Sequence, residues 1–178
     1  MNPESRSLAS YIRSVPDFPK QGIVFRDITT LLKDAHAFQQ AVEVLYARYK
    51  GERISKVVSI ESRGFILGAA LALRLEAGFV PARKKGKLPA ATVRQEYALE
   101  YGSDEIEIHR DAITAGERVL IHDDLLATGG TVTAACKLVE NLGGTIVGLS
   151  FLIELSFLKG RARLGSYDVF SIIQYDAE

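Results

Sequence analysis

At 178 residues, the chain is predicted to form a single domain, spanning residues 1–178, that buries most of its apolar surface in one core. Lys plus Arg and Asp plus Glu number 22 each, so the balanced charge argues against a nucleic-acid partner, and the single cysteine, Cys136, excludes an internal disulfide. No apolar run reaches membrane-spanning length, and the first residues, MNPESRSLAS, lack the basic and apolar regions of a signal peptide, so we expect a cytoplasmic protein without a membrane partner.

The spacing of apolar residues predicts helices and strands that alternate along the chain. Pro16, Gly51 and Gly143 each follow a helical pattern and are expected to end it. In chain order, the expected elements are helices over 5–15, 35–50, about 65–75 and about 131–142, and strands over 56–60, 79–82, 105–109, 119–123, 145–155 and 168–175.

The stretch over about 83–104 differs from the rest of the chain. It begins with the basic, turn-rich sequence RKKGKLP and continues with TVRQEYALEYG, whose strand-like residues have no clear apolar face. We therefore expect a mobile flap at this position, made of two strands.

Two loops follow apolar strands and are candidates for a binding site. Alternating strands and helices predict a parallel sheet covered on both faces, and in such sheets ligands bind outside the carboxyl ends of the strands. ESRG (61–64) follows one strand, and DDLLATGGT (123–131) follows VLIH. We expect these two loops to lie side by side and to form the site.

The sequence TGGT at 128–131 is suited to binding a terminal phosphate. It lies between a strand and a helix N-terminus, where glycines let backbone amides turn inward and the first helical turn adds free N–H groups and a positive dipole end. It is neither a Walker A loop nor a dinucleotide fingerprint, because GxxxxGK[ST] and GxGxxG are both absent.

The adjacent acids Asp123 and Asp124 would repel a phosphate, so we expect them to face another part of the same ligand. Ionised carboxylates only accept hydrogen bonds, and a vicinal diol offers two donors. A ribose 5-phosphate carries both features, and carboxylates beside the sugar could stabilise positive charge at its anomeric carbon. The alternative is structural: an acid pair that solvates a strand end, followed by a glycine turn that caps a helix.

The motifs resemble a known enzyme family. DDLLATGGT resembles the phosphoribosyl diphosphate motif of the type I phosphoribosyltransferases. The segments that resemble the adenine phosphoribosyltransferase family in particular are FPKQGIVFRDITTLL (18–32), ESRGF (61–65), RKKGKLP (83–89) and LEYG (99–102). The resemblance covers nearly the whole chain. His122 departs from it, because the family usually has an apolar residue such as valine there.

This resemblance implies an α/β type I phosphoribosyltransferase fold. The expected fold has a mostly parallel central sheet flanked by helices, a small N-terminal hood with the base-recognition segment over about 1–33, and the flexible flap. The implied reaction belongs to purine salvage: ribose 5-phosphate passes from phosphoribosyl diphosphate to N9 of adenine, giving AMP and diphosphate. A homodimer is also implied, as is Mg²⁺ held mainly through the substrate, near Asp123 and Asp124 and with no direct protein ligand.

The resemblance also assigns roles to individual residues. Catalytic roles are implied for Glu100, Asp123, Asp124 and Arg63. The 5-phosphate would be bound by Ala127, Thr128, Gly129, Gly130 and Thr131. The diphosphate would be bound by Ser62, Arg63, Arg83, Lys84, Lys87 and Tyr101. Adenine would be bound by Val24, Phe25, Arg26 and Leu126. The flap would close over the site, with Glu100 handling the proton on purine N7.

Other polar residues are expected to be structural or exposed. These are His36 and His109, the solvated Lys85, and Cys136 on the apolar face of its helix. Two other functions are alternatives: a purine-responsive transcription regulator on the same fold, and an enzyme for hypoxanthine, guanine or orotate. The first would need a DNA-binding segment, and the second should differ in IVFRDIT and LEYG.

Overall fold

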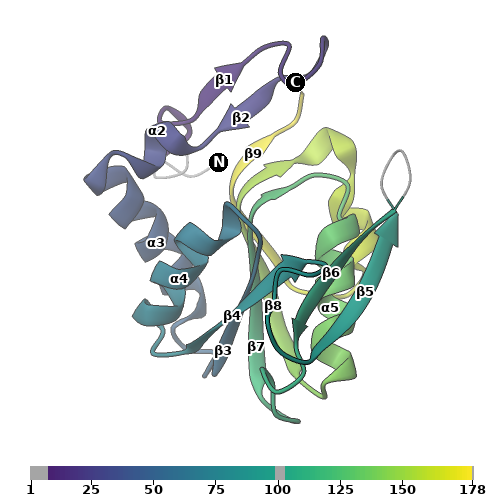
Figure 1. Ribbon diagram of the computed structural model, residues 1–178. Coiled ribbons are helices and arrows are strands. Elements are labelled where there is room, and N and C mark those ends of the chain that lie inside the picture. Colours follow the sequence, from purple (N-terminus) through teal and green to yellow (C-terminus); the bar gives the residue numbers. More distant parts are fainter. Residues whose placement is uncertain (1–7, 99–102, 178) are drawn as a thin grey trace.

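The computed structural model describes residues 8–98 and 103–177. Within these residues the main sheet has seven strands in the order β5-β6-β4-β3-β7-β8-β9 (Figure 1). Their bounds are β3 Lys56–Ile60, β4 Gly78–Lys84, β5 Thr92–Ala98, β6 Ser103–His109, β7 Arg118–Leu126, β8 Thr145–Leu155 and β9 Val169–Tyr175. The five strands from β4 to β9 in this order are parallel, and β6 runs antiparallel to β4 and β5. The expected α/β fold with a mostly parallel sheet is confirmed.

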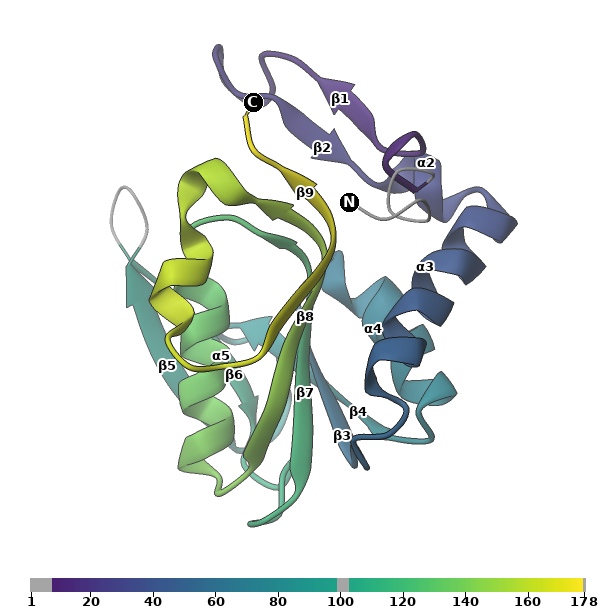
Figure 2. The ribbon, with the colours of Figure 1, turned by 180° about the vertical axis from the view of Figure 1, so that it is seen from behind.

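Helices cover both faces of the sheet (Figures 1 and 2). α3 (Ala35–Tyr49) and α4 (Gly64–Arg74) lie on one face, and α5 (Gly130–Asn141) lies on the other. These three helices were predicted to within one residue at each end. Asp34 caps α3 by accepting a hydrogen bond from Ala37 N at 2.9 Å. None of the described helices is long and apolar enough to cross a membrane.

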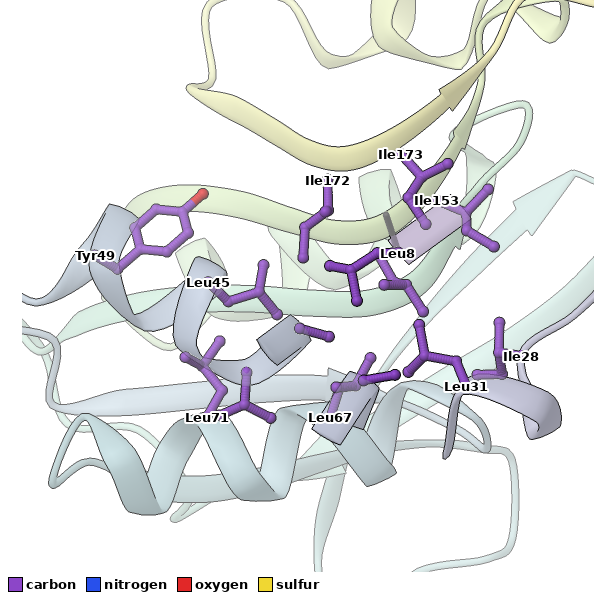
Figure 3. Close-up of a cluster of buried hydrophobic side chains, with 14 of the residues drawn as sticks. Leu8, Ile28, Leu31, Leu45, Tyr49, Leu67, Leu71, Ile153, Ile172 and Ile173 are labelled. Atoms are coloured by element: carbon purple, nitrogen blue, oxygen red, sulfur yellow. The ribbon is translucent and has the colours of Figure 1, made fainter. Parts of the chain in front are cut away.

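The core forms two layers, one under each set of helices. Figure 3 shows the first, in which Leu45 and Leu67 from the helices meet Ile153 and Ile172 from the sheet. The second layer lies under α5 and includes Cys136, which is 2% exposed. Burial and the nearby charge of Glu140 raise the pKa of the Cys136 thiol to about 12. The expected core role of Cys136 is confirmed.

The N-terminal segment corrects one prediction. The helix expected over 5–15 does not extend to residue 15, because β1 (Arg13–Val15) pairs antiparallel with β2 (Phe25–Asp27). Thr30 Oγ1 donates to Tyr11 O at 2.5 Å, and Arg13 Nη2 lies 2.5 Å from Asp27 Oδ2. These long-range contacts replace the helical hydrogen bonds that the apolar spacing suggested. The short α2 (Thr29–Leu32) follows β2.

The first two residues of the range expected for the flap, about 83–104, belong to the main sheet. β4 continues through Arg83 and Lys84, so these residues lie in the main sheet, paired with Glu107 and Ile106 of β6. β5 and β6 pair as an antiparallel ribbon, but β6 contains the strand that was predicted separately over 105–109, so only β5 lies wholly within the range expected for the flap. LEYG (99–102) lies outside the described residues.

The order of the strands places a crevice at one end of the sheet. The chain passes from β3 through α4 to β4 on one side, and from β7 through α5 to β8 on the other. β3 and β7 are neighbours, so the direction of winding reverses between them, and ligands bind at such a switch point. Residues 61–64 and 127–131 follow these two strands, so both predicted loops lie at the crevice.

Candidate functional site

The two adjacent acids lie inside a strand and not in the loop after it. β7 was expected to end near residue 123, but it continues to Leu126. Asp124 is 5% exposed, whereas Asp123 is half-buried and lines a cavity of about 80 Å³ beside the loop that follows. Asp123 Oδ1 also accepts a hydrogen bond from Asp124 N at 2.8 Å. The rigid strand therefore fixes both carboxylates.

Both carboxyl groups bind protons more readily than ordinary aspartates do. Burial and then the charge of Asp124 raise the pKa of Asp123 well above its usual value. Burial also raises the pKa of Asp124, against the opposing effect of the Arg63 guanidinium. Groups with shifted pKa values in a crevice are candidates for chemistry, because their protonation responds to a bound charge.

Arg63 joins three parts of the molecule at this crevice. Its Nε lies 2.9 Å from Asp124 Oδ2, and its guanidinium carbon lies 4.9 Å from the centre of the Phe25 ring in the N-terminal hairpin. The next residue, Gly64, allows the close approach, since a Cβ there would lie 2.8 Å from Asp123 Oδ1. Ser62 is exposed at the start of the same turn. The loop after β3 and the acids of β7 are thus in contact, as the sequence predicted.

The loop at 127–131 encloses the cavity that Asp123 lines. Gly129 has a φ of +81°, a left-handed conformation that strongly favours glycine, and α5 begins at Gly130. Thr133 Oγ1 donates to Gly129 O at 2.7 Å and fixes the turn. The cavity is lined by all five expected loop residues, Ala127, Thr128, Gly129, Gly130 and Thr131. Unpaired N–H groups of the first helical turn make this position suited to an anion.

The basic residues after Ala82 are held by carboxylates. Arg83 Nε donates to Glu61 Oε2 at 2.9 Å, and Lys84 Nζ lies 3.1 Å from Asp104 Oδ2. Lys87 is exposed. Lys85, which was expected to be solvated, is exposed but lies 2.5 Å from Glu105 Oε2 through its Nζ. Arg83 is therefore tied to the end of β3, whereas Lys84 is directed toward the ribbon.

Glu107, at only 1% exposure, organises the turn that carries Lys87. Its Oε1 accepts hydrogen bonds from the N–H groups of Gly86, Lys87 and Leu88 at 2.9 to 3.3 Å. Burial alone would raise the pKa of Glu107, but these hydrogen bonds and those from Thr92 and Arg94 outweigh it and lower the pKa. The ionised carboxylate therefore holds the basic turn against the sheet.

The residues expected to bind a base are divided between two places. Phe25 lines an apolar pocket of about 360 Å³ in the hairpin, and Val24 beside it is half-buried. Arg26 is 9% exposed, donates to Ser14 Oγ at 2.5 Å and stacks 3.9 Å from the centre of the Tyr175 ring. Leu126 is 1% exposed, belongs to the core under α5 and lines the loop cavity.

His122 lies in a buried polar row across three central strands. It pairs in register with Ser59 of β3 and Ser150 of β8, and all three residues are 0% exposed. His122 Nδ1 lies 2.9 Å from Ser150 Oγ, and burial lowers the pKa of the imidazole to about 4. The ring is therefore neutral at pH 7, and it lies beneath α4, where a Cβ added to Gly68 would lie 3.3 Å from its Cδ2 atom.

The remaining residues named in the sequence analysis do not lie among the described residues of this crevice. His36 is exposed and His109 is half-buried, and both lie away from the two loops. Glu100 and Tyr101 lie outside the described residues. The roles of Glu61 and Glu107 could not be predicted, because no local pattern identifies an acid that contacts arginine, lysine or turn N–H groups from a distant strand.

The chain is similar to known proteins over nearly its whole length. Residues 29–177 match the family model described as "Phosphoribosyl transferase domain". An adenine phosphoribosyltransferase of Acidobacterium capsulatum is 60% identical over 168 residues, covering 94% of this chain and 93% of its own length. The crystal structure of adenine phosphoribosyltransferase from Thermoanaerobacter pseudethanolicus has 53% identity and a TM-score of 0.93, covering 96% and 99% of the two chains. That of the Saccharomyces cerevisiae enzyme, complexed with an imino-altritol bisphosphate and adenine, has 40% identity and a TM-score of 0.91, covering 95% and 98%.

Proposed function

Because this chain belongs to the adenine phosphoribosyltransferase family, it is a purine-salvage transferase that converts adenine and phosphoribosyl diphosphate to AMP, and we propose that the crevice between β3 and β7 is its active site. One observation carries the assignment of the site. A glycine turn at the N-terminus of α5, the acid pair of β7 and Arg63 meet at the carboxyl ends of two neighbouring parallel strands.

The loop at 127–131 binds the 5-phosphate in this proposal. Its cavity adjoins the first turn of α5, whose N–H groups and dipole favour an anion. Asp123 and Asp124 accept hydrogen bonds from the ribose hydroxyls and stabilise positive charge at the anomeric carbon as the diphosphate leaves. Burial raises both pKa values, and a cationic sugar in the crevice would shift both carboxyl groups toward the ionised forms that this role requires.

The diphosphate is bound by the groups that follow β3 and β4. Arg63 offers the planar fork that suits phosphate oxygens, and Ser62 is exposed beside it. Lys87 is presented by the turn that Glu107 organises, and Arg83 and Lys84 lie at the adjoining end of β4. Tyr101 completes the set from the flap. Substrate binding would release Arg63 from Asp124. Arg63 would then bind the diphosphate, and Asp124 would bind the ribose hydroxyls.

Magnesium would act with the diphosphate. Within residues 8–98 and 103–177, no group of three or more His, Cys, Asp or Glu residues is placed to hold a metal ion. The ion prefers oxygen ligands and retains water, so the oxygens of phosphoribosyl diphosphate would supply most of its ligands, near Asp123 and Asp124. When bound, it would neutralise charge on the leaving diphosphate.

Adenine binds against the hairpin in this proposal. Phe25 and Val24 provide an apolar side, the backbone near Arg26 provides polar groups, and Leu126 completes the set from β7. Because the side chain of Arg26 is engaged with Ser14 and Tyr175, its role is to hold the hairpin on β9. The flap closes over the base, and Glu100 handles the N7 proton.

A second copy of the chain would cover the outer face of α4. Leu73 is 82% exposed, Ile66 43% and the neighbouring Phe79 38%, and Phe65 packs edge-on against Phe79. Ile66 and Leu73 are seven residues apart and share one face of the helix, and exposed apolar side chains that gather on one face suit a protein interface. We propose this surface as the contact of a homodimer, and the cytoplasmic location likewise stays a prediction.

A spectrophotometric assay tests the function. AMP formation is followed with adenine, phosphoribosyl diphosphate and Mg²⁺, and in parallel with hypoxanthine, guanine and orotate. We expect turnover with adenine at least a hundredfold above that with the other bases, because unmatched polar groups on the base cost several kcal/mol. Equal turnover with hypoxanthine or guanine would show that the hairpin does not select adenine.

A further inference from the structure

The backbone of the loop at 127–131 packs directly on a segment far along the chain. This supporting segment comprises residues 156–164 and contains η1 (Ser156–Leu158) and η2 (Gly160–Leu164), which lie beside α5 in yellow-green in Figure 2. A Cβ added to Gly160 would lie 2.0 Å from Ala127 O, and one added to Gly129 would lie 2.8 Å from Gly160 O. Side chains do not approach backbone atoms that closely, so the two backbones touch with no space for a side chain.

The supporting segment is fixed to the sheet by a buried carboxylate. Glu154 of β8 is 4% exposed and accepts hydrogen bonds from Arg161 Nε at 2.9 Å and Ser171 Oγ at 2.7 Å. Arg161 Nη1 donates to Val169 O at 2.8 Å, and Leu164 is buried in the core under α5. Contacts to β8, β9 and the core therefore hold Gly160 at a defined position.

This contact also restricts the orientation of the loop peptides. The C=O of Ala127 points at Gly160, and in a planar trans peptide the N–H of the next residue points the opposite way. The N–H of Thr128 is therefore directed away from the supporting segment. A shift of the loop would change the direction of the Thr128 N–H. It would also change the left-handed backbone conformation at Gly129.

We propose that Gly160 is a positioning residue for 5-phosphate binding, which sets the orientation of the loop amides while the Glu154–Arg161 ion pair holds it in place. This inference rests on the assignment of the loop to the 5-phosphate. Gly160 acts through the backbone of the loop. Because it has no side chain, the two backbones can touch.

The substitution Gly160→Ala tests the proposal. The added methyl group must displace Ala127 O by about 1 Å or more, so the backbone of the loop must move. We expect the dissociation constants of AMP and ribose 5-phosphate, measured by calorimetry, to rise on the order of tenfold or more. Adenosine lacks the phosphate, so its affinity should change less than twofold. The KM for phosphoribosyl diphosphate should rise more than kcat falls.

Two further variants separate positioning from a general loss of stability. Gly51→Ala is the matched control, because a Cβ there meets nothing within 4 Å, and it should leave all affinities unchanged. Arg161→Gln loosens the supporting segment without adding bulk near the loop, and it should weaken AMP binding about three- to tenfold while sparing adenosine. Urea unfolding of each variant establishes that the measured protein is folded.

The outcomes are distinguishable. If folded Gly160→Ala and Arg161→Gln both bind AMP as the unmutated protein does, the positioning role is wrong. Equal weakening of AMP and adenosine would also overturn it, because the effect would then not pass through the phosphate. If the unmutated protein itself binds AMP no better than adenosine, the assignment of the loop to the 5-phosphate fails instead.

Discussion

The Nε atom of Arg63 lies 2.9 Å from Oδ2 of Asp124, in a pair where the acid side chain is 7% exposed and the arginine 34%. Arg63 Nη1 and Asp124 Oδ2 are both buried and make no hydrogen bond within the described residues. A half-satisfied, partly buried pair contributes little to folding, because desolvation of the carboxylate offsets much of the attraction. Its consequence is electrostatic: the guanidinium favours the ionised form of a carboxyl group whose pKa is raised by burial.

Replacing Arg63 should therefore change the pH dependence of the reaction. Arg63 lowers the pKa of Asp124 against the effect of burial, so Arg63→Met should raise this pKa. The acid limb of the kcat/KM profile should move to higher pH, and the rate at pH 7 should fall on the order of a hundredfold. Arg63→Lys keeps the positive charge but loses the planar guanidinium with its paired N–H donors, so the acid limb of the kcat/KM profile should stay at the same pH. Identical profiles for all three proteins would contradict the coupling.

Neutralising the acid pair should remove most activity without unfolding the chain. Asp123→Asn combined with Asp124→Asn keeps the side-chain shapes but loses the charges that order the ribose and stabilise the sugar cation. Losing one preorganised contact typically costs on the order of a hundredfold in turnover, and losing two should cost more. Steady-state kcat is the measurement, with circular dichroism as the control for folding. Turnover within tenfold of the unmutated enzyme would mean that the pair has only a structural role.

A side chain at Gly130 should weaken ligands that carry the 5-phosphate. Gly130 begins α5 and lines the loop cavity, so Gly130→Val would obstruct the approach of the phosphate to backbone N–H groups. We expect AMP and phosphoribosyl diphosphate to bind on the order of tenfold or more weakly, by the cost of overpacking. Calorimetry with AMP measures this, and an unchanged affinity would show that the turn is only a helix cap.

His122 should make the stability of the protein fall in mild acid. Its pKa is about 4 in the folded protein against 6.5 in the unfolded chain, so between these values the unfolded chain binds more protons. Titration of His122 therefore leaves the free energy of unfolding unchanged above pH 6.5. As the pH falls from 6.5 toward 4, it lowers the free energy of unfolding by up to about 3 kcal/mol. His122→Asn retains a partner for Ser150 and should remove this slope in urea unfolding, whereas replacement of the exposed His36 should not. Parallel curves for His122→Asn and the unmutated protein would contradict the account.

Much of the site could be predicted because its signals are local. A glycine turn between a strand and a helix specifies its own conformation, and Gly129 has the left-handed φ that such a turn needs. The alternation of elements then predicted that the loops after β3 and β7 would meet, and Arg63 does reach Asp124.

The errors arose where distant parts of the chain decide local structure. Leu8 and Ile12 have helical spacing and are buried, but pairing with β2 makes the chain extended from Arg13 onward. The same reasoning explains why β7 extends through both acids: β8 pairs with it as far as Glu154. The role of Gly160 could not be predicted, because no local pattern reports the approach of a segment so far along the chain.

The last prediction concerns the exposed face of α4. Burying Leu73 in a symmetric contact should contribute about 2 kcal/mol from each copy, so placing a lysine there should weaken the dimer on the order of a thousandfold. We expect the unmutated protein to sediment as a dimer at micromolar concentration and Leu73→Lys as a monomer. Leu158→Lys, at another exposed leucine outside α4, is the matched control and should remain a dimer. Two results would place the interface elsewhere: a dimeric Leu73→Lys, or dissociation of Leu158→Lys alone. An unmutated protein that sediments as a monomer would refute the dimer itself.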